Sequence, residues 1–262
     1  MTEQEWLTSD DPVAMLDWLY QHHTPSDRKL RLAMCAMTRA GGADNTELMR
    51  RVSLAERWAD GEIDREAVIA HVDLGESTSW RYWAVAHHIP RDATEWASQS
   101  YKWVAPFVLR EVFGNPFQPV TLPPGEKCPV CASRRRWQET WCRVCRNTER
   151  GTSPVLTPLV LQLAEAAYTV RTGTGALGND VLAVLSDALE EAGLEDKSQV
   201  CPRCIDGSGV RLGLYGEPPR VKCHHCGGEG KLRFANPILA HLREPGPHYR
   251  GCWALDLLLG KE

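Results

Sequence analysis

The chain has 262 residues, of which 43% are hydrophobic and 24% are charged, and its formal net charge is −4 at pH 7. This composition is typical of a globular protein with a sizeable core, and the charge argues against a protein that coats nucleic acid. No apolar run approaches the roughly 20 residues that span a bilayer, and the acidic first residues do not resemble a secretory signal. We therefore expect a cytoplasmic protein that has no membrane partner.

Residues 1–122 are predicted to be helical. Asp11 followed by Pro12 is an N-cap with proline at the first helical position, where the missing N–H is not needed. Periodic apolar residues predict a second helix over 26–40 that stops at Gly41. Further helices are expected after Asn45, over 66–72, over 79–88, and from Asp92 onward, with a kink or break at Pro106.

A Pro-rich stretch over 116–127 predicts an extended connection before helices resume. Thr157-Pro158 and Asn236-Pro237 repeat the pattern of an N-cap followed by proline, so a helix is expected to start at each. Two further helices are predicted over 179–192 and 251–259. Cysteine-rich segments interrupt this helical pattern twice.

Eight of the ten cysteines occur in CxxC pairs, and the pairs form two sets. Within each set, the two pairs are separated by a segment short enough to form a hairpin. The eight cysteines are Cys128, Cys131, Cys142 and Cys145 in the first set, and Cys201, Cys204, Cys223 and Cys226 in the second. Two CxxC turns brought together by a hairpin supply four thiolates in a tetrahedron, which suits Zn²⁺. We expect two zinc ions per chain, each bound locally, and we expect both to be structural.

Two other ligand arrangements remain open at this stage. The pairs could cross between the sets, although the helical segment between Cys145 and Cys201 makes pairing within each set more economical. His224 and His225 lie between Cys223 and Cys226, so an imidazole could replace a thiolate. Since four cysteines are already available, we expect both histidines to lie outside the metal's ligand set.

Glycines follow each CxxC pair of the second set in a spacing that is similar to a known zinc-binding motif. Cys223 to Gly230 fits the spacing CxxCxGxG, and Cys201 to Gly209 fits it with one extra residue. This stretch of about 33 residues resembles the cysteine-rich zinc module of the DnaJ-type chaperones, with two of the four motifs that such modules carry. The J-domain His-Pro-Asp motif is absent from the sequence, so the resemblance implies a zinc-binding hairpin and not a chaperone.

A second resemblance covers most of the chain outside the cysteine sets. The segments that carry it are 5–7, 15–16, 26–32, 55–61, 109–117, 187–193, 238–241, 245–248 and 250–262, the last being the closest match. They resemble a family of uncharacterised helical proteins abundant in planctomycete bacteria. The resemblance implies that both cysteine sets are insertions into a helical scaffold. It implies no activity and no catalytic residue.

Together these features predict a mainly α protein, a helical scaffold with two small inserted β-hairpin zinc ribbons. The expected regions are a helical region (1–122), the first ribbon (123–152), a helical region packing with the first (153–198), the second ribbon (199–234) and C-terminal helices (235–262). The function that this organisation favours is non-enzymatic. We expect a zinc-binding protein-interaction or adaptor module, with another protein as its partner.

Nucleic-acid binding is the alternative function. Over 126–151 seven basic residues occur with three glutamates, and two tryptophans lie among the arginines. Bases stack on aromatic rings while arginines contact phosphates, so the candidate contacts are Arg134, Arg135, Arg136, Trp137, Trp141 and Arg143. The same arginines could instead neutralise a zinc ion held by four thiolates, whose net charge is about −2.

An enzyme is the third hypothesis. His248 and Cys252 lie four residues apart before the last predicted helix, where a helix N-terminus can lower a thiol pKa and support a Cys–His nucleophile. The apolar residues around Cys252 favour a buried core thiol instead. The phosphate-binding, serine-hydrolase, metalloprotease and dinucleotide motifs are absent from the sequence.

Overall fold

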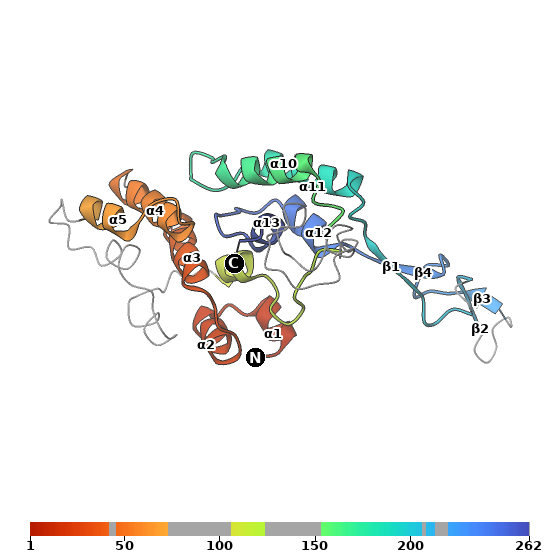
Figure 1. The fold of residues 1–262 in the computed structure, drawn as a ribbon. Helices are drawn as coiled ribbons and strands as arrows, with labels where there is room; N and C mark the ends of the chain where they lie inside the picture. The colour runs from red at the N-terminus through yellow and green to blue at the C-terminus, as the bar shows by residue number, and fades with distance from the viewer. Residues whose placement is uncertain (42–45, 73–105, 124–152, 206–207, 213–219, 262) are drawn as a thin grey trace, which may run out of the picture. The chain divides into compact units, whose positions relative to one another are not determined.

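The computed structural model describes residues 1–41, 46–72, 106–123, 153–205, 208–212 and 220–261. Within these ranges the chain is mainly helical, with four short strands (Figure 1). The helices are α1 (Glu3–Thr8), α2 (Pro12–His22), α3 (Asp27–Ala40), α4 (Thr46–Ala59), α5 (Arg65–Val72), α8 (Pro106–Phe113), α10 (Pro158–Thr169), α11 (Asn179–Glu191), α12 (Pro237–Arg243) and α13 (Trp253–Leu259). The strands are β1 (Lys197–Val200), β2 (Val210–Leu212), β3 (Arg220–Lys222) and β4 (Lys231–Phe234).

The chain divides into two compact units. Unit 1 comprises 1–122, 156–185 and 245–262, and unit 2 comprises 123–155 and 186–244. The predicted helical region 153–198 is therefore divided between the units. Residues 156–185 belong to unit 1 together with the N-terminal helices, and the rest belong to unit 2. In the parts of the chain that the structure describes, no helix is both long enough and apolar enough to cross a membrane.

Local sequence determines where several helices begin. The side chain of Asp11 accepts hydrogen bonds from the backbone N–H groups of Val13 (2.9 Å) and Ala14 (3.1 Å), so it caps α2 in front of Pro12. Thr157 caps α10 and Asn236 caps α12 in the same way, each followed by proline. These three predicted helix starts are confirmed, and each cap satisfies N–H groups that the helix itself leaves unpaired.

The hydrophobic core of unit 1 forms where α3 packs against α4 and α8, and where α2 packs against α8. Leu16, Met34 and Leu109 are among its buried members. Trp6 of α1 is fully buried in the same cluster, and its indole N–H donates to the backbone oxygen of Gly114 (3.0 Å). Helix α1 therefore belongs to the core although the sequence analysis did not predict it.

Buried charges also hold unit 1 together. The guanidinium of Arg28 donates to both carboxylate oxygens of Asp256 (2.9 Å each), and it forms an ion pair with Asp60 (2.9 Å). The ammonium of Lys29 lies 2.6 Å from the same Asp256 carboxylate. Both aspartates are about 1–2% exposed, so the network ties α3 and α13 to the end of α4 in an environment that water barely reaches.

Unit 2 contains buried apolar residues and a β ribbon. Its buried apolar residues include Leu189, Leu194, Ile238, Leu239 and Leu242. The ribbon consists of two nested antiparallel strand pairs (Figure 1). Strand β1 pairs with β4, and the shorter strands β2 and β3, which lie between them in the sequence, pair with each other. The cysteines of the second set lie in the two segments that connect these strand pairs, between β1 and β2 and between β3 and β4.

The predicted fold class is confirmed in its main part, a helical protein with small hairpins. The helices predicted over 26–40, after Asn45, over 66–72 and over 179–192 correspond to α3, α4, α5 and α11. A described helix begins at Pro106, where a break was expected. The predictions for 79–88, for 92–105 and for the first cysteine set lie outside the described residues.

Candidate metal centre

Backbone hydrogen bonds place the two CxxC turns of the second set face to face. The N–H of Cys201, directly after β1, donates to the oxygen of Gly230, directly before β4 (2.9 Å). The N–H of Cys223, directly after β3, donates to the oxygen of Gly209, directly before β2 (2.8 Å). Each turn is thus fixed to the opposite arm of the ribbon, and the two turns face each other at the junction of the hairpins.

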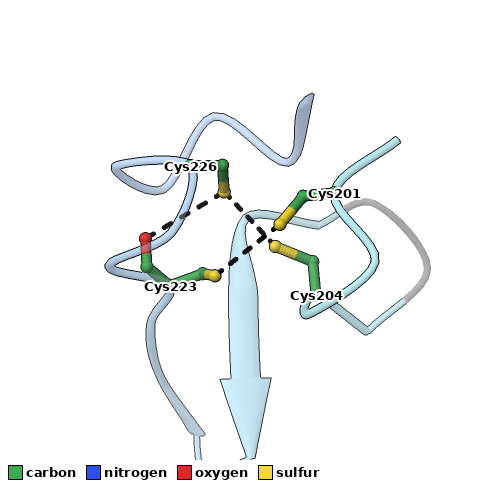
Figure 2. A group of neighbouring side chains, drawn as sticks. All are labelled: Cys201, Cys204, Cys223 and Cys226. Atoms are coloured by element: carbon green, nitrogen blue, oxygen red, sulfur yellow. Dashed lines mark hydrogen bonds between the residues drawn. The ribbon is translucent and has the colours of Figure 1, made fainter. Parts of the chain in front are cut away.

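The four sulfur atoms converge on one point, as Figure 2 shows. The Sγ atoms of Cys201 and Cys223 are 3.9 Å apart, and those of Cys204 and Cys226 are 3.3 Å apart. All four lie within 4.8 Å of one another. Four sulfurs at the Zn–S distance of about 2.3 Å in a tetrahedron would be about 3.8 Å apart. The separations therefore fit one thiolate-bound metal ion, and the donor set favours zinc or an iron–sulfur centre.

The local backbone favours ionised sulfurs. The N–H of Gly230 donates to the sulfur of Cys226 (3.3 Å), and the N–H of Cys226 helps to lower the pKa of Cys223 to about 7. Burial and hydrogen bonds from the neighbouring thiols instead raise the pKa of Cys204. Thiols this close cannot all ionise unless a cation compensates their charges, and a bound divalent metal supplies that compensation.

Two glycines make the close approach of the turns possible. Gly209 has φ +75°, and a Cβ built there would overlap the backbone carbonyl of Gly228. Gly228 has φ +88°, and a Cβ there would overlap the aliphatic part of Lys222. The backbone conformation therefore disfavours a side chain at both positions, and at Gly209 a Cβ would also overlap backbone atoms that cannot rotate away. The motif glycines that carried the resemblance have a physical role in this chain.

The histidines within the second CxxC turn are both exposed, and neither belongs to the group of converging ligand atoms. The structure thus brings together Cys201, Cys204, Cys223 and Cys226 without His224 or His225. The first set, Cys128, Cys131, Cys142 and Cys145, lies outside the described residues, as do Arg134, Arg135, Arg136, Trp137, Trp141 and Arg143. The first zinc site and the nucleic-acid contacts remain predictions.

The suggested Cys–His pair lies in the interior of unit 1. Cys252 is 0% exposed and His248 is 2% exposed. Burial raises the pKa of the Cys252 thiol well above its ordinary value, and the nearby Glu111 carboxylate adds to the rise. A thiol held in its protonated form is a weak nucleophile, so this environment favours the interpretation of Cys252 as a buried thiol over that of a nucleophile.

Glu111, a buried carboxylate beside His248, was missed by the sequence analysis. Its carboxylate lies 3.1 Å and 3.2 Å from Nδ1 of His248, although the two residues are 137 positions apart. No local pattern around position 111 distinguishes a buried glutamate from the exposed ones that helices usually carry.

Comparisons of the chain with protein-family models, with curated proteins and with solved structures found no match. The two family resemblances inferred from the sequence therefore stay predictions. The interpretation of the site rests on the geometry and the chemistry of the residues themselves.

Proposed function

We propose that the protein is a non-enzymatic zinc-binding protein in which zinc-stabilised ribbons serve as a protein-interaction module. The observation that carries this proposal is the convergence of four cysteine sulfurs at the junction of the two hairpins. The first cysteine set has the same paired motifs, so we propose a second ion there and a total of two zinc ions in the two cysteine sets.

A metal would supply the stability that the ribbon does not obtain from a core. Each of its sheets has two strands, and among its large apolar residues Val200 is 57% exposed and Phe234 is 48% exposed. A two-stranded hairpin is marginally stable in water, whereas zinc binding by four thiolates contributes directly to folding. A four-cysteine site has no open position for a reacting water, which supports a structural role for the ion.

The exposed surface of the ribbon supports a protein partner. Val200 and Phe234 present apolar side chains to solvent at opposite ends of the β1–β4 pairing. The segment 201–233 contains six basic and three acidic residues. Once a zinc–tetrathiolate charge of about −2 is counted, little positive charge remains to attract a polyanion. Exposed apolar side chains on strands are features that other proteins recognise.

Metal analysis of paired variants tests the zinc assignment. Cys223→Ser with Cys226→Ser should remove one zinc ion per chain and make residues 197–234 sensitive to protease, while the remaining helical scaffold stays folded. Cys142→Ser with Cys145→Ser is the matched variant for the first set. Loss of both ions from either double variant would show shared sites, and a wild-type protein without zinc would overturn the assignment.

Binding assays test the interaction role. Proteins captured from nuclease-treated native lysate on immobilised wild-type chain should be lost when Val200→Ser and Phe234→Ser are combined, while the zinc content stays unchanged. Val184→Ser is a suitable control because Val184 is also exposed (53%) but belongs to α11. If the ribbon variant captures the same proteins as wild type, the ribbon surface is not the interaction site.

A further inference from the structure

The interior of unit 1 contains a second group of metal-ligating side chains, separate from all CxxC pairs. Glu111 lies in α8, His248 lies in the loop before α13, and Cys252 is the N-cap residue of α13. One ligand atom from each lies within 4.8 Å of the others. The residues are 6%, 2% and 0% exposed, so a carboxylate, an imidazole and a thiol share a site that water barely reaches.

The separation of the carboxylate and imidazole atoms fits two ligands of one ion. Two ligand atoms at about 2.05 Å from a tetrahedral zinc are about 3.4 Å apart. Nδ1 of His248 lies 3.1 Å and 3.2 Å from the two carboxylate oxygens of Glu111, so only a small adjustment is needed to admit an ion between them. Carboxylate oxygen, imidazole nitrogen and thiolate sulfur are the three ligand types that zinc uses in proteins.

Charge balance also favours a divalent cation. A carboxylate and a thiolate together carry two negative charges, a neutral imidazole carries none, and a divalent ion makes the whole group neutral. Burying an isolated carboxylate is costly, and a neutral metal centre avoids that penalty. The same three side chains without a cation must keep a proton on at least one of the acidic groups.

The loop that carries two of these ligands is held rigidly. The N–H of Tyr249 donates to the carboxylate of Glu111 (3.3 Å), and the N–H of Cys252 donates to the oxygen of Tyr249 (3.0 Å). Gly251 has φ +93°, and a Cβ there would lie 2.8 Å from Cβ of Leu32. Preorganised ligands whose neighbours fix their orientation are the arrangement found around protein metal ions.

We propose that Glu111, His248 and Cys252 form a structural zinc site in the interior of unit 1. The site is independent of the cysteine ribbons because none of its ligands belongs to a CxxC pair. The ion would join α8 to the start of α13, two elements that lie far apart in the sequence.

Zinc content of the full-length chain tests the proposal. His248→Asn combined with Cys252→Ala should hold one zinc ion fewer per chain than wild type, while Cys223→Ser with Cys226→Ser loses a different ion and the losses add. Cys35→Ser is the matched control because Cys35 is also a buried thiol of unit 1, 1% exposed, outside the group. It should keep the wild-type zinc content.

A second measurement decides the question if the double variant does not fold. X-ray absorption at the zinc edge of the wild-type protein should show a mean below four sulfur ligands per ion, with nitrogen or oxygen ligands making up the rest. Ions bound by four cysteines alone would give sulfur only. An all-sulfur environment, or a folded double variant with the wild-type zinc content, would overturn the proposal.

Discussion

Two glycines of the ribbon distinguish the cost of a left-handed backbone from the cost of steric overlap near the candidate metal centre. Gly227 has φ +59° and nothing within 4 Å of a Cβ position, whereas Gly209 has φ +75° and a Cβ there would overlap the carbonyl of Gly228. Gly227→Ala should therefore cost only the penalty of a left-handed alanine, about 1–2 kcal/mol. In the proposed zinc site, metal binding is coupled to folding of the ribbon, so zinc affinity should fall by about five- to thirty-fold.

Gly209→Ala should cost considerably more. The added Cβ must push the two CxxC turns apart, because the atom it meets belongs to the backbone and cannot rotate away. That movement breaks the hydrogen bond from the N–H of Cys223 to the oxygen of Gly209 (2.8 Å). The left-handed penalty and a lost buried bond together amount to about 3 kcal/mol or more, a reduction in zinc affinity of about a hundred-fold or greater.

The assay is a titration of each zinc-loaded protein with a chelator of known affinity. Amide hydrogen exchange over 197–234 follows the release, so other ions in the chain do not contribute to the signal. Amide exchange over 197–234 should rise at a lower chelator concentration in Gly227→Ala than in wild type, and at a still lower concentration in Gly209→Ala. Equal losses in the two variants, or a larger loss in Gly227→Ala, would refute the argument that contact between the turns determines metal affinity.

Two further predictions concern other parts of the chain. Asp256→Asn should destabilise unit 1 by about 3 kcal/mol in urea unfolding, because it weakens a buried partner of Arg28; a loss below about 0.5 kcal/mol would contradict the role of the network. If the first cysteine set binds nucleic acid, alanine at Arg134, Arg135 and Arg136 should lower the salt slope of binding by up to about three. Absence of DNA and RNA binding by wild type at low salt would exclude that alternative.

Local patterns predicted the features that depend on neighbouring residues. The cap and proline at Asp11-Pro12 identified the start of α2, and the spacing of the CxxC pairs identified the cysteines whose sulfur atoms meet in the second set. Helix α1 was missed although Thr2 and Glu5 form a reciprocal capping box, a pattern visible in the sequence. The capping box is therefore a local signal for α1.

Features that depend on distant residues were not predictable in this way. Arg28 meets Asp256 across 228 positions, and Glu111 meets His248 across 137. Helical periodicity shows which face of a helix is buried, but it does not show which other segment covers that face. A charged residue on a buried face therefore gives no sign of its partner until the tertiary structure is known.

The two ends of the ribbon lie side by side. Lys197 pairs with Phe234 at the base, and just below them the N–H of Asn236 donates to the carboxylate of Asp196 (2.9 Å). Because the ribbon begins and ends at the same pair of strand residues, its length or its tip can change without moving the helices on either side. The ribbon is thus a unit that can be moved between proteins. A loop of another protein can accept the whole ribbon if the ends of that loop are as close together as two paired strands. In this chain, a two-residue turn can replace the ribbon.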